Sequence, residues 1–300
     1  MRRVCVIGGS RYFGKRLIER LVARGDEVTV VNRGSAPAPA GVEQLVADRN
    51  DEAALRAALG DRVFDVVVDQ VCYTPVQAAI ARRVFEGRTG RYVMTSTIEV
   101  YEHEDADHPL PEDALDLAAV VVRPELPWGD PAFLEEHYGE GKRQAEAVFA
   151  AAPAFPYVTV RVGHVLGGAD DFTGRLEHYA DRLRAGEPVA VTEPNRPSTY
   201  IYVEEIADFL AWAAGAEFTG PVNALAHGPL TTRDIVEAVR AVTGGAAPEY
   251  RVAGAGEAAS PFAFARAYGM SGARAEELGF AFSHTGDWLG GAVAGTLAAR

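Results

Sequence analysis

Cysteine is scarce in this chain, and so are long apolar segments. Only Cys5 and Cys72 are present, too few for a zinc cage, and both lie in apolar runs typical of buried strands. The longest apolar runs, such as 117–122, fall far short of the roughly 20 residues that span a bilayer. Arg2 and Arg3 lead straight into a strand and a glycine turn without a cleavage site, so we expect no signal peptide. We therefore expect a reduced, cytoplasmic protein with no metal centre and no membrane partner.

Basic residues are also fewer than acidic ones. The 29 lysines and arginines are outnumbered by 42 aspartates and glutamates, which gives a formal net charge of −13, and no run of four basic residues occurs. Such a surface repels a long nucleic-acid duplex. The sequence therefore predicts a small-molecule substrate and no nucleic-acid partner. With 300 residues, 48% of them hydrophobic, the chain is long enough for a full core and for about two domains.

What the sequence does contain is an alternation of strand-like and helical segments over its first half. Apolar runs rich in Val and Ile predict strands buried on both faces, at 3–7, 27–32, 42–47, 64–69, 91–96 and 157–162. Helical patterns lie between them, at 15–23, 52–59 and 75–85, the second capped by Asn50 or Asp51 and ended by Gly60. This order predicts an α/β fold, a doubly wound parallel sheet of the Rossmann type.

The regular alternation of strand-like and helical segments ends near residue 165. Helical patterns at 172–185, 204–214, 233–243 and 286–298 are separated by short strands and loops rich in Pro and Gly. A smaller lobe that is partly interleaved with the sheet fits this pattern better than a second copy of the same fold. We predict a first domain at 1–165 and a C-terminal lobe at 166–300, with about 200–225 returning to the first domain.

A glycine-rich turn follows the first strand. Gly8 permits a tight turn, Gly9 lets backbone amides approach a phosphate, and Gly14 allows the next helix to pack closely on the strand. The N-terminus of that helix adds a favourable dipole for a pyrophosphate. A glycine-rich turn with no ligand is the alternative. At the first strand of a βαβ unit, we predict a dinucleotide site in domain 1–165, formed by Gly8, Gly9, Ser10, Arg11, Tyr12, Phe13 and Gly14.

The end of the second strand indicates which dinucleotide binds. NAD sites place an acidic residue there, about 20 residues beyond the turn, to bind the ribose hydroxyls. This chain has Asn32 and Arg33 instead, and Arg11 supplies a second guanidinium. Two guanidiniums suit the 2′-phosphate of NADP, so NADP is the predicted cofactor; NAD is the alternative if both arginines are merely solvated. Asp48, after the third strand, either binds the adenine amino group or caps the next helix.

A tyrosine precedes one of the two lysines of the chain by four residues. Tyr138 and Lys142 share one face of a helix at this spacing, and chance predicts only roughly 0.07 such pairs for 11 tyrosines. A nearby ammonium lowers the pKa of a phenol, so the pair predicts proton transfer by Tyr138, with Lys142 also holding a ribose hydroxyl. A plain surface pair is the alternative. Gly139 and Gly141 weaken a helix, which indicates close backbone approach or a helix that is just starting.

Polar residues also end the fifth predicted strand. The carboxyl ends of strands in such a sheet face the ligand crevice. Thr97 is therefore a candidate hydrogen-bond donor to a substrate oxygen. Glu99 is either a catalytic base or a salt-bridge partner at the rim of the crevice.

Together these motifs resemble the extended short-chain dehydrogenases/reductases, the family of NAD-dependent epimerases and dehydratases. The resemblance covers nearly the whole chain and includes 161–167 (Arg-Val-Gly-His-Val-Leu-Gly), 200–207 (Tyr-Ile-Tyr-Val-Glu-Glu-Ile-Ala) and 221–223 (Pro-Val-Asn). It implies that Thr97, Tyr138 and Lys142 form a catalytic triad, that the glycine turn binds the cofactor, and that most of the chain from about 166 onward binds substrate. Members often pair through helices beside the tyrosine helix, so a homodimer is one expectation.

Some residues depart from the family pattern. Arg11 makes the glycine turn similar to that of a subgroup that includes chloroplast stem-loop-binding proteins. The end of the fifth strand resembles nucleotide-sugar 4,6-dehydratases and glucuronate decarboxylases, but Ile98 stands where the dehydratases have Asp. Ser198 stands where epimerases have an arginine for a nucleotide diphosphate, and Arg196 is the nearest substitute. His164 stands where Asn is frequent, and we expect it to keep a hydrogen bond to a backbone group.

The resemblance thus implies an NAD(P)-dependent oxidoreductase or epimerase that exchanges hydride with a secondary alcohol or ketone carbon of a sugar or nucleotide sugar. Tyr138 would move the hydroxyl proton, Lys142 would lower its pKa, Thr97 would orient the carbonyl, and Glu99 completes the candidate catalytic set. One alternative is a ketoreductase acting on a non-sugar metabolite, which the missing diphosphate arginine favours. Another is a non-catalytic nucleotide- or RNA-binding member of the fold, against which the net charge and the intact triad both count.

Overall fold

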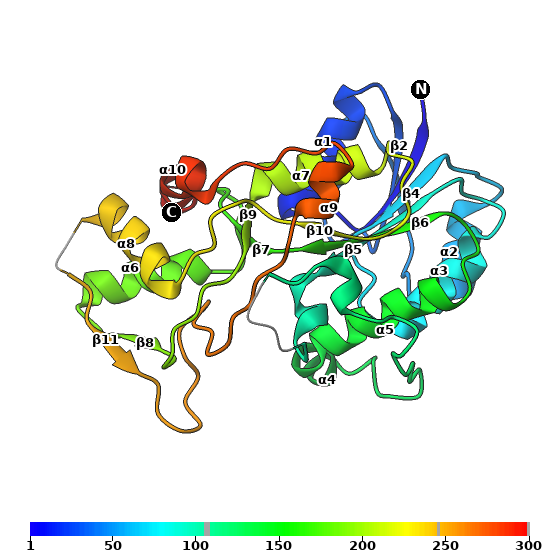
Figure 1. Cartoon of the computed structure of the whole chain (residues 1–300). Coiled ribbons are helices and arrows are strands. Elements are labelled where there is room, and N and C mark those ends of the chain that lie inside the picture. The colour runs from blue at the N-terminus through cyan, green and yellow to red at the C-terminus, as the bar shows by residue number, and fades with distance from the viewer. Residues whose placement is uncertain (105–108, 245–246, 299–300) are drawn as a thin grey trace.

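The computed structural model describes residues 1–104, 109–244 and 247–298, and these ranges contain a seven-stranded parallel sheet (Figure 1). The strand order is β10-β6-β5-β4-β1-β2-β3. The strands are β1 (Arg3–Ile7), β2 (Glu27–Asn32), β3 (Glu43–Val46), β4 (Val66–Asp69), β5 (Tyr92–Thr97), β6 (Tyr157–Val162) and β10 (Gly220–Ala224). The order reverses between β1 and β4, and in such sheets ligands bind in the crevice at the carboxyl ends of the strands beside this point.

Helices cover both faces of the sheet. They are α1 (Tyr12–Ala23), α2 (Glu52–Leu59), α3 (Pro75–Phe85), α4 (Pro131–Glu136), α5 (Tyr138–Ala151), α7 (Val203–Ala213) and α9 (Ala273–Glu277). Helices α1 and α7 pack together on one face, and α2, α3 and α5 lie on the other (Figure 1). Alternate residues of β1 serve the two cores: Val4 and Val6 join the first, Cys5 and Ile7 the second. Strands buried on both faces explain their continuous apolar sequence.

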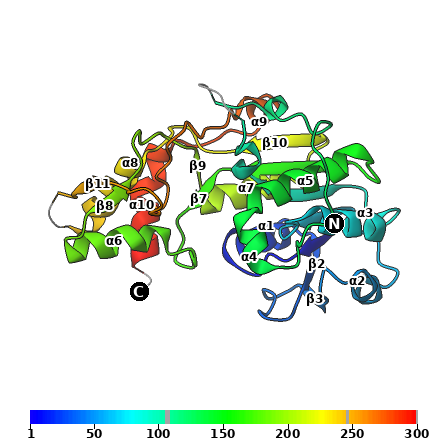
Figure 2. The same cartoon turned by 90° about the horizontal axis from the view of Figure 1, so that it is seen from below.

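A second group of elements lies to one side of the sheet (Figure 2). It contains α6 (Arg175–Ala185), β8 (Val189–Val191), α8 (Thr232–Thr243), β11 (Tyr250–Val252) and α10 (Thr285–Leu297), and the short pair β7 (His164–Leu166) and β9 (Tyr200–Tyr202) lies between it and the sheet. Leu176, Val236 and Val293 belong to its core, which the three helices share. None of the helices in the described ranges has both the length and the apolar character needed to cross a membrane.

The doubly wound parallel sheet predicted from the sequence is confirmed, and several element bounds shift. Helix α1 begins at Tyr12, three residues earlier than predicted. Strand β4 begins at Val66, because Phe64 forms only an isolated bridge, and β5 extends to Thr97. Helix α6 begins after Gly174, whose left-handed φ of +68° ends the preceding loop. Strand β10 adds to the sheet beside β6, while the domain boundary near residue 165 stays a prediction.

Local signals fix the ends of the second helix. Asp51, not Asn50, is the N-cap of α2, and its carboxylate accepts a hydrogen bond from the Ala54 amide at 3.0 Å. Gly60 ends the helix with a positive φ of +56°. A side-chain acceptor at the start and a glycine at the end are the residues that helix termini favour.

A buried ion pair joins α5 to strand β6 of the sheet. The side chains of Glu146 and Arg161 are fully buried and approach to 2.8 Å. Ser96 of β5 and Thr159 of β6 donate to the same carboxylate, at 2.5 and 3.0 Å. On its other side, Arg161 donates to the Tyr101 hydroxyl at 2.7 Å. Hydrogen bonds therefore satisfy both charges, as a stable buried pair requires.

Removing one partner of this pair leaves an unpaired charge in the core. We predict that Glu146→Ala lowers the free energy of unfolding by about 3–5 kcal/mol, measured by urea denaturation. The control Glu237→Ala removes an exposed carboxylate that pairs with Arg240 on α8, and its cost should stay below about 1 kcal/mol. Similar losses for the two variants would contradict the central role of the buried pair.

Candidate active site

The glycine turn brings β1 and α1 into close contact. Gly8 and Gly9 adopt left-handed φ values of +79° and +75°. A Cβ on Gly8 would lie 2.7 Å from a methyl of Val71, and a Cβ on Gly14 would lie 2.5 Å from the Gly9 Cα. The turn therefore requires glycine at these positions, as the sequence predicted, and it leaves backbone amides at the N-terminus of α1.

Aromatic residues follow the glycines at the start of α1. Tyr12 is buried, and its positive φ of +52° is a strained conformation for a residue with a side chain. Its ring meets those of Phe13 and Phe172 edge to face, with centroids 5.8 and 5.9 Å apart. Its hydroxyl has no hydrogen-bond partner among the described residues. Strain of this kind clusters at ligand sites, which agrees with a binding role for the turn.

Two guanidinium groups are free near the glycine turn, Arg33 after β2 and Arg11 just before α1. Asn32 is engaged within the protein: it donates to the Ser10 hydroxyl and accepts from the Gly34 amide, both at 2.8 Å. Arg11 and Arg33 are exposed, and their side chains make no hydrogen bond or ion pair with any residue that the structure describes. Asn32 thus shapes the loop, and the two arginines are available to a ligand.

Asp48 lies in the turn that precedes α2. Its carboxylate accepts hydrogen bonds from the backbone and side-chain amides of Asn50, both at 2.9 Å. It does not cap α2, since Asp51 takes that position. Contact between Asp48 and an adenine stays a prediction.

Two glycines let the first turn of α5 touch neighbouring backbone. A Cβ on Gly139 would lie 2.6 Å from the Glu99 carbonyl oxygen, and a Cβ on Gly141 would lie 2.5 Å from the Tyr73 carbonyl oxygen. Helix α5 also begins at Tyr138, so both explanations offered for these glycines are confirmed. The close approach sets Tyr138 beside the segment that follows β5.

Lys142 is buried beneath Tyr138, one turn along α5. Its ammonium donates to the Thr95 carbonyl at 2.6 Å and lies 4.5 Å from the centre of the Tyr73 ring. The centre of the Tyr138 ring is 5.8 Å away. Burial lowers the pKa of Lys142 to about 8, because a buried ammonium loses hydration. The residue therefore stays cationic at neutral pH yet is easily deprotonated.

The pKa of Tyr138 moves in the direction opposite to the one expected. Burial raises it, while a hydrogen bond with the Thr97 side chain acts to lower it. The expectation of a lowered pKa is wrong for this protein, because loss of hydration outweighs the attraction of the Arg175 guanidinium. Tyr138 is therefore a neutral phenol at neutral pH.

Thr97 and Glu99 extend the site beyond β5. The Thr97 hydroxyl caps the short 3₁₀ helix that follows, accepting from the Glu99 amide at 3.3 Å. The Glu99 carboxylate accepts a hydrogen bond from the Tyr268 hydroxyl, and burial raises its pKa. No ion pair of Glu99 is found within the described residues, which does not support a salt-bridge partner at the rim.

The four predicted catalytic residues line one cavity of about 470 Å³, and Phe13 of the glycine turn lines it too. Sequence analysis missed other side chains of its wall, among them Gln70, Tyr73 and Arg175. Gln70 and Tyr73 follow β4, beside the point where the strand order reverses. Ligands bind at this point in such sheets, so a place after the fourth strand could have marked both residues. Arg175 comes from α6, and no motif marked it.

Sequence comparison places the chain among known proteins. It matches the family model described as the NAD dependent epimerase/dehydratase family over residues 4–224. The chain belongs to this family. UDP-glucuronic acid decarboxylase 1 of Arabidopsis thaliana is 23% identical over 272 residues, which cover 80% of this chain and 58% of that protein. The 2'-dehydrokanamycin reductase of Streptomyces kanamyceticus is 29% identical over 138 residues, 43% of this chain and 39% of that protein. The chain thus spans little more than half of the decarboxylase and less than half of the reductase.

Solved structures share the fold of this epimerase/dehydratase family member along its whole length. The Bordetella bronchiseptica enzyme WbmH, in complex with NAD+, superposes with a TM-score of 0.75 at 18% identity, covering 100% of this chain and 98% of that one. UDP-glucose 4-epimerase of Thermotoga maritima, with UDP-glucose, also gives 0.75, at 17% identity and with coverage of 99% and 98%. At these identities the likeness concerns the fold.

Two residues that depart from the family pattern, Ser198 and His164, are buried in the structure. Ser198 is fully buried, and its hydroxyl donates to the Tyr268 carbonyl at 2.5 Å; Arg196 is exposed and lies outside the cavity. His164 lines the cavity, but its Nε2 has no hydrogen-bond partner among the described residues. The expected bond to a backbone group is therefore wrong. Aromatic rings surround the imidazole instead, with Phe264 stacked at 5.0 Å.

The close approach of α5 gives a testable pair of substitutions in this family member. Gly141→Ala should destabilise the protein and lower activity, because its Cβ would overlap the Tyr73 carbonyl and push α5 off the site. Gly295→Ala, in α10, meets no atom within 4 Å and should stabilise the protein by about 0.5–1 kcal/mol. Thermal unfolding of both variants checks the prediction. An unchanged Gly141→Ala protein would show that the contact is dispensable.

Proposed function

We propose that this protein is an NAD(P)-dependent oxidoreductase or epimerase that exchanges hydride with a secondary alcohol or ketone carbon. The single observation that carries the proposal is the convergence of Thr97, Tyr138 and Lys142 on a cavity also lined by Phe13 of the glycine turn. Membership of the NAD-dependent family supports it. When bound, the nicotinamide ring supplies or accepts the hydride.

The residues divide the proton chemistry between them. Tyr138, protonated at neutral pH because burial raises its pKa, donates its phenolic proton to a carbonyl oxygen as that carbon is reduced. Lys142 holds positive charge one turn away, which stabilises the phenolate that forms, and its remaining protons are available to a ribose hydroxyl. The Thr97 hydroxyl, which lines the same cavity as Tyr138, orients the substrate oxygen. Glu99 lines the wall and accepts from Tyr268, which supports a positioning role.

We propose NADP as the preferred cofactor, with Arg11 and Arg33 holding its 2′-phosphate. Both guanidiniums are exposed and without protein partners, and no acidic residue ends β2. Guanidinium groups suit a phosphate dianion, whereas an acidic residue at this position would repel it.

The relatives suggest a sugar or nucleotide sugar as substrate, since their names refer to UDP-glucuronic acid and UDP-glucose. Reduction of a non-sugar ketone is the second candidate, because Ser198 is buried and the site lacks an arginine there.

Ile98 lines the cavity where dehydratases place an acid, which argues against a 4,6-dehydratase. Return of the hydride to the opposite face of a retained ketone would give an epimerase, and release of the alcohol a reductase.

Three further proposals concern the subgroup within the family, the cellular location and the oligomeric state. Arg11 supports a place near the subgroup that includes chloroplast stem-loop-binding proteins, but the net charge of −13 works against binding of structured RNA. The buried free cysteines, Cys5 and Cys72, support a reducing, cytoplasmic setting. The family resemblance alone supports a homodimer.

Replacing the proton donor tests the proposed chemistry. Tyr138→Phe should lower turnover of any ketone substrate at least about 100-fold, the usual contribution of a general acid, and leave NADPH affinity nearly unchanged. The assay is nicotinamide absorbance over a panel of ketones. Tyr202→Phe, which removes a hydroxyl outside the cavity, is the matched control. Unchanged turnover in Tyr138→Phe would refute the assignment.

Cofactor choice has its own test. Arg33→Ala should weaken NADPH more than NADH, because only NADPH carries the 2′-phosphate. Arg240→Ala, an equal charge change on α8, should affect neither. Titration of nicotinamide fluorescence gives all six dissociation constants, for the wild type and both variants. Equal losses for the two cofactors in Arg33→Ala would mean that this arginine is only solvated surface.

A further inference from the structure

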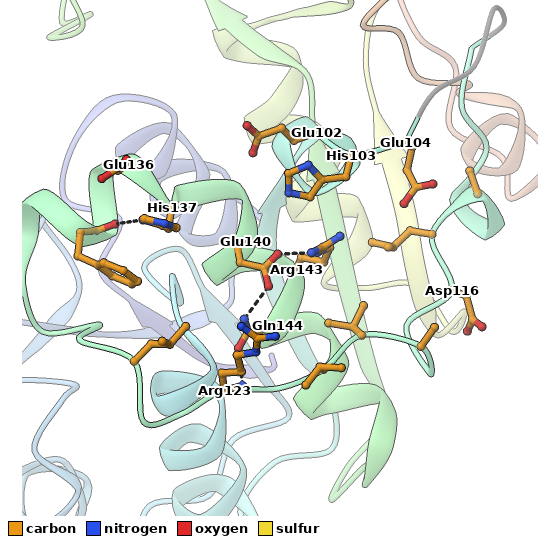
Figure 3. Close-up of a pocket in the computed structure, with 17 residues that line it drawn as sticks. Glu102, His103, Glu104, Asp116, Arg123, Glu136, His137, Glu140, Arg143 and Gln144 are labelled. Carbon is orange, nitrogen blue, oxygen red and sulfur yellow. Dashed lines mark hydrogen bonds and ion pairs between the residues drawn. The ribbon is translucent and has the colours of Figure 1, made fainter.

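A second cavity of about 900 Å³ adjoins the catalytic one, and Glu102 and Glu136 line both. Residues at 102–104 and 114–126 contribute to its wall, together with α4 and α5 (Figure 3). Glu102 and Glu136 therefore border the cavity that contains Tyr138 on the side of the larger cavity.

Negative charge dominates this junction. Four glutamates line the catalytic cavity: Glu99, Glu102, Glu135 and Glu136. The side chains of Glu102, Glu135 and Glu136 make no hydrogen bond or ion pair with any residue in the described ranges. Their charges are available to a ligand.

Two basic side chains, Lys142 and Arg175, also line the catalytic cavity. Lys142 donates to the Thr95 carbonyl. Arg175 donates to the Thr173 hydroxyl at 3.0 Å and to the Val165 carbonyl at 3.2 Å. Neither side chain pairs with a carboxylate of the described residues, so both keep their charge, and four glutamates against these two cations leave the lining with an excess of negative formal charge.

Two arginines, Arg123 and Arg143, line the larger cavity. Arg143 pairs with Glu140, which also accepts from Gln144 at 2.6 Å. Arg123 lies beside Gln144, on the far side of Glu140 from Glu102 in Figure 3. Neither arginine forms an ion pair with Glu102 or Glu136 in the described part of the chain.

His164 provides an independent sign of a ligand. It is 8% exposed, lines the catalytic cavity, and its Nε2 has no partner among the described residues. Burial lowers its pKa to about 3, so the imidazole is neutral and adds no positive charge. A buried polar atom without a partner costs free energy until a ligand supplies one.

We propose that the substrate carries a protonated amine near its reacting hydroxyl or carbonyl group, as in an amino sugar or a similar amino alcohol. The ammonium lies between Glu102 and Glu136, and a substrate hydroxyl bonds to His164. The inference rests on the proposed function, since it takes the cavity at Tyr138 as the place of reaction. The same carboxylates repel a nucleotide diphosphate.

Binding to the NADPH-loaded protein tests this directly. Dissociation constants are measured by ligand-observed NMR for D-glucosamine, D-glucose and UDP-glucose. Wild type should bind glucosamine about 10-fold more tightly than glucose, and added salt should shrink the ratio because it screens charge. The double variant Glu102→Gln/Glu136→Gln should bring the ratio to about 1. Glu217→Gln/Glu277→Gln, which removes two exposed charges elsewhere, should preserve it.

Four results would overturn the inference: equal affinity for the two sugars, no binding of either, tighter binding of UDP-glucose, or an unchanged ratio in the Glu102→Gln/Glu136→Gln variant. Failure of the proposed function is distinguishable, because it would show as no nicotinamide turnover with any ketone while the preference for the amine persists.

Discussion

The ion pair between Glu146 and Arg161 is the interaction on which the site depends. Glu146 lies one turn beyond Lys142 on α5, so the pair anchors the catalytic helix to β6, while Ser96 ties the same carboxylate to β5. The Tyr101 hydroxyl bonds both to Arg161 and, at 2.9 Å, to Asn223 of β10. Elements far apart in sequence thus share one buried network, and the tyrosine helix is held against the strand end that carries the threonine.

Much of the fold followed from the sequence, because its signals are local. Continuous Val and Ile runs marked six strands, and the glycine turn marked the crevice. The spacing of Gly139 and Gly141 indicated a close backbone approach, and the structure supplies the carbonyls that they meet. The proximity of Thr97 to Tyr138 followed from strand-end geometry, and both residues line one cavity.

What the sequence did not reveal depends on contacts between distant segments. Tyr268 bonds to Glu99 across 169 positions, and no periodicity marks such a pair. The pKa of Tyr138 was misjudged because spacing shows a nearby lysine but not how thoroughly burial removes water. The isolation of His164 depends on Phe264 and its aromatic neighbours, which reach it from another part of the chain. Local sequence patterns located the candidate catalytic residues, whereas tertiary packing determines their pKa values and their hydrogen-bond partners.

A fluorescence titration of the purified protein with NADPH and with NADH tests the account most directly, after any nucleotide carried through purification has been released and counted. The glycine turn, the free arginines and Lys142 together predict saturable binding of one nucleotide per chain, with NADPH bound more tightly. Nucleotide already retained at one per chain would also agree with the account and would favour an epimerase cycle. No retained nucleotide and no binding of either cofactor would contradict the central claim that this cavity is a dinucleotide-dependent active site.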